Sequence, residues 1–147
     1  MTKKAGIDDI AVHIPDLYVD AENFEQYRKF DPGKVTKGVG IKKMSINDAH
    51  EDANTMAAMA VLKLLRQNDL KPSDVEMLDV ATETSYDESK GANSYIIGML
   101  EQVYGRSTFR HCGGVEQKFA CVPGGYAVYH HTNWIRSGEN DGKAGIV

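Results

Sequence analysis

Cys121 has the surroundings expected of a nucleophile. It follows the apolar stretch 115–120 and precedes a predicted helix that begins near Gly124. A thiol at the start of a helix lies at the positive end of the helix dipole, which favours the reactive thiolate. The glycines at 124 and 125 allow backbone amides to approach an acyl oxygen closely. The alternative for a lone cysteine is a small buried hydrophobic residue.

Glu83 is the matching candidate for a general base. It follows the predicted strand 75–81, and a carboxylate just past a buried strand is partly desolvated, which favours proton abstraction. The alternative is a solvated acidic loop in which Asp87 or Ser89 caps the next helix. Together, a thiol and a base on neighbouring strand ends suit carbon–carbon bond formation on a thioester. The cysteine holds an acyl group, and the carboxylate removes a proton alpha to its carbonyl.

The remaining histidines and cysteine predict no metal site. His130 and His131 are neighbours in a predicted helix, so their side chains point about 100° apart and cannot form an i, i+4 ligand pair. Cys112 has no C-x-x-C partner. Lys34, Lys37, Lys42 and Lys43 leave two interpretations open, a solvated face or a patch for phosphates such as those of coenzyme A.

Composition excludes several classes of protein. The chain has 147 residues, with 17 basic and 21 acidic residues and a formal charge of -4. This mild acidity argues against nucleic-acid binding, and no apolar run is long enough to span a membrane. The N-terminal sequence is not that of a signal peptide, and two cysteines favour a reducing compartment. The sequence therefore predicts a single cytoplasmic globular domain.

The order of the predicted elements favours an α/β layered architecture, with a mostly parallel sheet and helices on its faces. The predicted strands span residues 6–14, 75–81, 115–120 and 143–147, and the predicted helices span 22–30, 51–67, 91–104 and 124–136. Region 35–44 is predicted to be an exposed loop or ribbon. A parallel sheet is buried on both faces, so we expect a chain that stops in a strand to be part of a larger unit.

The sequence resembles a known family, the hydroxymethylglutaryl-CoA synthases, which are condensing enzymes of the thiolase superfamily. The resemblance is to the N-terminal part of the family and spans essentially all 147 residues. It is carried by Asp31-Pro32-Gly33-Lys34 with Gly38-Val39-Gly40, by Thr82-Glu83-Thr84-Ser85-Tyr86-Asp87-Glu88-Ser89-Lys90, by Phe119-Ala120-Cys121 and by Asn133-Trp134-Ile135.

The resemblance implies a thiolase-like fold of two similar α/β halves, of which residues 1–147 form the N-terminal half-domain. It implies that Cys121 accepts acetyl from acetyl-CoA and that Glu83 deprotonates the acetyl methyl, which then adds to acetoacetyl-CoA. Asp31 and Pro32 match acyl-CoA contact positions. The chain would thus be a cytoplasmic acyltransferase of the mevalonate pathway, with coenzyme A thioesters as substrates and no other cofactor.

Two departures from the family pattern qualify these expectations. Val122-Pro123-Gly124-Gly125 stands where the family usually has Tyr-Gly-Gly-Thr, and Pro123 removes one backbone donor. The family's general-acid histidine lies in a second half that nothing here matches, so we expect a C-terminal-half chain or a homo-oligomer as partner. The alternatives are another thiolase-superfamily acyltransferase, from which Glu83 distinguishes the chain, and a non-catalytic scaffold or acyl-CoA-binding module.

Overall fold

A computed structural model describes residues 4–147, which form two compact units. The small unit is His13–Asp52, and the large unit combines the N-terminal segment up to Val12 with Ala53–Val147. Each unit is described by itself below. No helix in the described part of the chain is long and apolar enough to cross a membrane.

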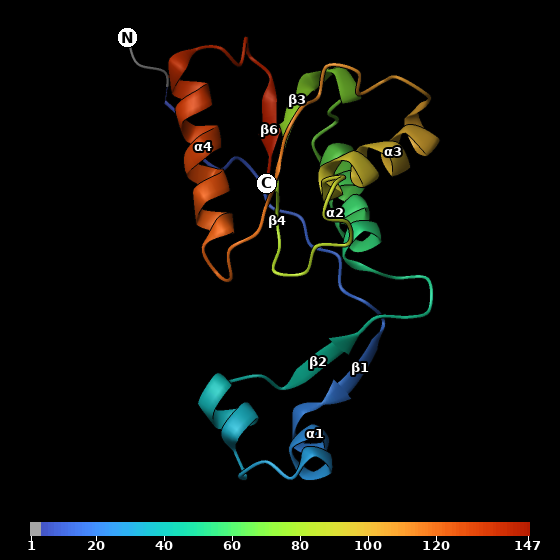
Figure 1. Cartoon of the computed structure of the whole chain (residues 1–147), viewed down its shortest axis with the longest axis vertical. Helices are drawn as coiled ribbons and strands as arrows, with labels where there is room; N and C mark the ends of the chain where they lie inside the picture. The colour runs from blue at the N-terminus through green and yellow to red at the C-terminus, as the bar shows by residue number, and fades with distance from the viewer. Residues whose placement is uncertain (1–3) are drawn as a thin grey trace. The chain divides into compact units, whose positions relative to one another are not determined.

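The small unit is a two-stranded antiparallel ribbon with two helical segments. Its elements are β1 (Leu17–Asp20), α1 (Ala21–Arg28), the π-helical segment η1 (Lys34–Val39) and β2 (Lys43–Ile46), and β1 pairs with β2 (Figure 1). The predicted helix 22–30 is confirmed as α1, which ends where Lys29 adopts a left-handed conformation with φ of 55°.

One prediction for the N-terminal third is wrong, and a second is only partly confirmed. No residue in the described range 4–16 belongs to a strand, and the apolar side chains proposed for strand 6–14 are exposed. Alternating apolar residues form a strand only when the backbone pairs with a neighbouring strand, and this segment has no such partner. Region 35–44, predicted to be an exposed loop or ribbon, ends in the first residues of β2, so the ribbon alternative is confirmed there, whereas the helical turns of η1 were not predicted.

The large unit contains a mostly parallel arrangement of strands between helices, as the sequence predicts. Its elements are α2 (Ala53–Gln67), the 3₁₀ turn η2 (Pro72–Asp74), β3 (Val75–Leu78), β4 (Val80–Ala81), α3 (Ala92–Tyr104), β5 (Glu116–Gln117), α4 (Pro123–Ser137) and β6 (Ala144–Ile146). β3 pairs with β6 and β4 pairs with β5, both in parallel.

Residues 75–81 run through the middle of this sheet. The amide of Leu78 donates to the carbonyl of Gly113 on one side, and the amide of Asp79 donates to Ile146 on the other. Asp79 is the single residue between β3 and β4. The predicted strand 75–81 is therefore confirmed apart from this break. The predicted strand 115–120 is only two residues long, as β5.

Helices cover the two faces of the sheet differently (Figure 1). α2 and α3 pack against the face that carries Leu78, and together they form the apolar core. The buried residues of that core are Ala58, Val61, Leu62, Leu65, Val75, Leu78, Ile96, Leu100, Phe109 and Ile146. Successive strand residues face opposite ways, so Asp79 faces α4. α4 buries Pro123, Ala127 and His131, which are spaced four residues apart.

Candidate active site

Cys121 and Glu83 lie in contact, as their places in the sequence predict. The thiol of Cys121 donates a hydrogen bond to Glu83 Oε1 over 3.3 Å. The parallel pairing of β4 with β5 explains this contact, because Ala81 at the end of β4 lies beside Gln117 at the end of β5. Both strands therefore end at the same edge of the sheet, and the chain continues from there into the acidic loop and into the cysteine turn.

The pair lines a small open pocket. Its volume is about 210 Å³, and its lining consists of Ala81, Thr82, Glu83, Ala120, Cys121, Pro123 and Gly124. Cys121 is exposed, so a ligand can reach its sulfur directly. This volume is below the roughly 300–1,000 Å³ of pockets that hold drug-sized ligands, so it suits an acyl group bound at the sulfur rather than a whole nucleotide.

The backbone before the sulfur is strained. Ala120 has a φ of 45°, in the left-handed region that costs a non-glycine residue roughly 1–2 kcal/mol. The amide of Val122 donates to the carbonyl of Phe119 and closes a turn around the cysteine. Strain of this kind persists only where the surroundings impose it, and it gathers at functional sites. α4 then begins at Pro123, one residue before the predicted start.

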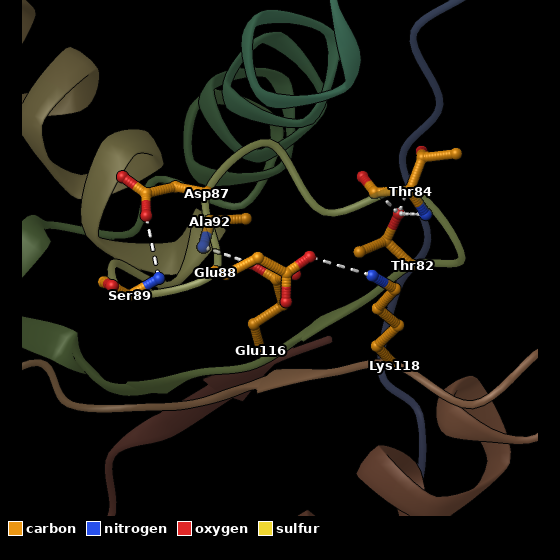
Figure 2. A network of polar contacts seen from close by, with 8 residues as sticks. All are labelled: Thr82, Thr84, Asp87, Glu88, Ser89, Ala92, Glu116 and Lys118. Atoms are coloured by element: carbon orange, nitrogen blue, oxygen red, sulfur yellow. Dashed lines mark hydrogen bonds and ion pairs between the residues drawn. The ribbon is translucent and has the colours of Figure 1, made fainter.

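Side chains from β5 and the segment after it hold the loop that follows Glu83 (Figure 2). Glu116 accepts the backbone N–H of Ala92, the first residue of α3, over 2.7 Å. Lys118 forms an exposed ion pair with Glu88 at 3.2 Å. Both contacts join residues at least 24 positions apart, so no local pattern in the sequence predicts them.

The acidic loop is ordered by its own side chains as well. Asp87 accepts the amides of Ser89 and Lys90 at 2.8 and 3.1 Å, and it accepts the Tyr95 hydroxyl at 2.9 Å. These bonds, the Ser89 amide first, lower the pKa of Asp87. Neither Asp87 nor Ser89 caps α3, because that role falls to Glu116. The prediction that Asp87 or Ser89 caps α3 is therefore wrong. Glu83 and Glu88 are exposed, which agrees with the solvated loop and not with the expected partial desolvation of Glu83.

Asp31 and Pro32 belong to the small unit, where both are exposed. Beside them, the buried carboxylate of Glu25 accepts the amides of Gly33 at 2.9 Å and Thr36 at 2.8 Å. It therefore fixes the turn that leads into η1. The contact of Asp31 and Pro32 with an acyl-CoA stays a prediction.

In the small unit, the side chains of Lys34, Lys37, Lys42 and Lys43 are all exposed. Two of them lie over aromatic rings, Lys34 over Phe30 at 5.2 Å and Lys43 over Tyr18 at 3.8 Å. Cation–π contacts of this type hold an ammonium group in place while it stays accessible to an anion. Both earlier interpretations, solvated face and phosphate patch, are compatible with this arrangement.

The fold is that of the thiolase-like proteins. A solved structure of 3-oxoacyl-(acyl-carrier-protein) synthase III matches with a TM-score of 0.74 at 22% identity, covering 93% of this chain and 39% of that chain. A structure of MvaS in complex with 3-hydroxy-3-methylglutaryl coenzyme A matches with a TM-score of 0.84 at 37% identity, covering 97% of this chain and 33% of that chain.

Within that class the family is defined by sequence. All of residues 1–147 match the family described as hydroxymethylglutaryl-coenzyme A synthase N terminal. The chain is 42% identical to hydroxymethylglutaryl-CoA synthase of Haloferax volcanii over 143 residues, which is 97% of this chain and 32% of the relative. It is 33% identical to the cytoplasmic hydroxymethylglutaryl-CoA synthase of Rattus norvegicus, covering 99% of this chain and 27% of the relative.

The chain therefore belongs to the hydroxymethylglutaryl-CoA synthase family, and it spans about a third of the length of the relatives it matches.

Proposed function

We propose that this chain provides the nucleophile and the base of a hydroxymethylglutaryl-CoA synthase reaction. Cys121 becomes acetylated by acetyl-CoA, and Glu83 deprotonates the acetyl methyl group. The observation that carries the proposal is the 3.3 Å contact between Cys121 Sγ and Glu83 Oε1. It sets a carboxylate beside the sulfur to which the acetyl group would be attached.

In the first step the Cys121 sulfur attacks the thioester carbonyl of acetyl-CoA. A new carbon–sulfur bond forms at Cys121, the carbon–sulfur bond to coenzyme A breaks, and the thiol proton leaves with the coenzyme A sulfur. The first amides of a helix have no acceptor within the helix. Since Pro123 has no N–H, Gly124 and Gly125 carry the first amides of α4 that can donate to the carbonyl oxygen.

In the second step Glu83 takes a proton from the methyl group of acetyl-Cys121. The resulting carbanion adds to the ketone carbon of acetoacetyl-CoA, whose oxygen receives a proton. Water then cleaves the thioester, which restores the Cys121 thiol and releases hydroxymethylglutaryl-CoA. The acid that protonates the ketone is assigned to the C-terminal portion of the enzyme, because the described pocket contains no histidine.

A partner surface supports this assignment. Val122, directly before α4, and Tyr126 and Tyr129 on α4 are 50%, 63% and 61% exposed. Aromatic side chains in an exposed apolar stripe mark a surface that another protein element covers. We assign that role to a C-terminal half or, failing it, to a second copy of this chain. Light scattering that shows a stable monomer in a mixture of the two halves would contradict the assignment.

The small unit is proposed to bind the coenzyme A portion. Asp31 and Pro32 are the contact positions carried over from the family, and the exposed lysines beside them supply positive charge for phosphates. The substrates are thus acetyl-CoA and acetoacetyl-CoA, with no further cofactor. A location in the cytoplasm is proposed on the basis of relatives whose names include it.

The experiment separates the two steps. The chain is incubated with acetyl-CoA, and the mass of the peptide that contains Cys121 is measured, with Cys121→Ser as the blank. The chain is then combined with a separately expressed C-terminal portion and acetoacetyl-CoA, and release of coenzyme A is followed. Glu83→Ala should acetylate largely as the unmodified chain does and should lose condensation.

Two outcomes overturn the proposal. If Cys121 acquires no acetyl group in any of these mixtures, it is not the nucleophile. If Glu83→Ala loses acetylation and condensation equally, Glu83 does not act at the methyl group. Glu88→Ala is the matched control, because Glu88 is an acidic residue of the same loop that is not part of the pocket lining, and it should preserve both steps.

A further inference from the structure

A second cluster of polar side chains lies on the α4 side of the sheet. Asp79, between β3 and β4, has a fully buried side chain, and two consecutive α4 residues converge on its Oδ2 atom. His130 Nδ1 lies 3.1 Å from that oxygen, and His131 Nε2 lies 3.3 Å from it. The two rings point apart, as neighbours on a helix must, and they approach the carboxylate from different directions.

The two distances to Asp79 are those expected between neighbouring ligands of one metal ion. The three ligand atoms all lie within 4.8 Å of one another. Zinc binds imidazole nitrogen and carboxylate oxygen at about 2.0–2.1 Å in tetrahedral geometry, which separates neighbouring ligand atoms by about 3.3 Å. Two histidines and one carboxylate are also a ligand set that transition metals use.

The His131 ring needs a partner that no side chain gives it. The residue is 5% exposed, and neither of its ring nitrogens has a hydrogen-bond partner among the described residues. Its approach to Asp79 is close but does not have hydrogen-bond geometry. A buried unpaired polar atom is costly, and a metal ion at Nε2 removes that cost.

The surroundings orient the carboxylate and leave access to it. Asp79 Oδ1 accepts the amide of Val115 at 2.9 Å, and the Gln117 side chain lies 3.3 Å from Oδ2. Hydrogen bonds from neighbouring groups to a metal-binding side chain fix its orientation and raise the affinity for the metal. The His130 side chain is half exposed, so solvent reaches the cluster from that side.

We propose that Asp79, His130 and His131 form a mononuclear binding site for a transition-metal cation of the Zn²⁺ class. The ion would fasten α4 to the centre of the sheet, at residues other than Cys121 and Glu83. The alternative is that no metal binds and that a proton is held between the imidazoles and Asp79, which then form an ion pair.

The test measures Zn²⁺ binding to the chain without an affinity tag. Chelator-treated protein is titrated with Zn²⁺ at pH 7 in competition with a chromophoric chelator, and Co²⁺ is used in parallel for its visible absorption. One equivalent should bind. His130→Gln should weaken binding at least about tenfold, the lower end of what loss of an outer-shell contact alone costs. His111→Gln, a matched change at an exposed histidine outside the cluster, should not weaken it.

Two results overturn the inference. Equal Zn²⁺ affinity for the unmodified chain and His130→Gln would show that the cluster holds no metal, and so would the absence of one-equivalent binding. Loss of binding in Cys121→Ser would assign the metal to the thiol instead. Because the His130 side chain is half exposed, His130→Gln should fold, and circular dichroism of the metal-free variant checks this. Zn²⁺ should also raise the Tm of the unmodified chain and not that of His130→Gln.

Discussion

The carboxylate of Glu116 accepts the backbone N–H of Ala92 over 2.7 Å, although the two residues are 24 positions apart. The contact joins β5, which leads to Cys121, to the first turn of α3, which follows the loop that carries Glu83. A negative group at the start of a helix satisfies a free amide and opposes the positive end of the helix dipole. Glu116 therefore connects the two segments from which the candidate active site is made.

Glu116→Ala should consequently destabilise the chain. Loss of a capping acceptor costs about 0.5–2 kcal/mol in the free energy of unfolding, which urea denaturation followed by circular dichroism will measure. Lys118→Ala is the matched control, because its ion pair with Glu88 is exposed and such pairs contribute about 0–1 kcal/mol. A larger loss for Lys118→Ala than for Glu116→Ala would contradict the assigned role of the cap.

The two cysteines should differ in reactivity. Burial raises the pKa of Cys112 to about 11, so at pH 8 only about one Cys112 thiol in a thousand is ionised. Cys121 is exposed and contacts a carboxylate. Timed alkylation with iodoacetamide, followed by peptide mass spectrometry, should modify Cys121 first. Between pH 8 and pH 10 the Cys112 rate should rise about tenfold per pH unit, because its thiolate fraction does.

The alkylation experiment also distinguishes a catalytic role of Cys121 from a non-catalytic module. A thiol that serves only to fill space reacts slowly at neutral pH, whereas an accessible nucleophile reacts readily. Equal slow labelling of Cys112 and Cys121 would favour the module.

The contact between Cys121 and Glu83 was predictable because it depends on one general rule. Parallel strands end at the same edge of a sheet, so residues that follow two paired strands must come close. The boundaries of α3 and α4 were predictable for a local reason, since glycines and Pro123 mark their ends. No such rule links Glu116 to Ala92 or Asp79 to His131, since those contacts depend on the final packing of distant segments.

The buried face of α2 shows a further limit. The apolar stripe that the sequence suggests is Ala53, Met56, Ala57, Ala60, Val61 and Leu64. The structure fully buries Asn54, Ala58, Val61, Leu62 and Leu65. Only Val61 is common to both sets, while Ala57 and Leu64 are partly buried against the core. Because α2 has apolar residues on most of its circumference, its neighbours α3 and β3 decide which face turns inward. The sequence predicts the helix but not its rotation.

Gly145 should be intolerant of a side chain. A Cβ atom added there would lie 2.2 Å from His131 Nδ1, so Gly145→Ala must displace the buried ring or β6. Overpacking of this kind costs about 1–3 kcal/mol. Gly98→Ala in α3 is the control, since a Cβ there has open space and should stabilise the helix by about 0.5–1 kcal/mol. Urea denaturation of both variants measures the difference, and a Gly145→Ala variant as stable as Gly98→Ala would refute the close packing.

Glu25 should make the turn before η1 sensitive to acid. The amides of Thr36, Gly33 and Val35 lower the pKa of the Glu25 carboxyl below its ordinary value of 4.5. A carboxyl whose folded pKa is lowered contributes stability that is fully present above the unfolded pKa and is lost as the pH falls through the folded one. Hydrogen exchange of the peptide 31–40 should therefore show protection at pH 7 that declines below about pH 4.5. In Glu25→Gln the protection should be lower at pH 7 and should change little over the same range. If both proteins lose protection in parallel, the acid sensitivity of this turn does not come from Glu25.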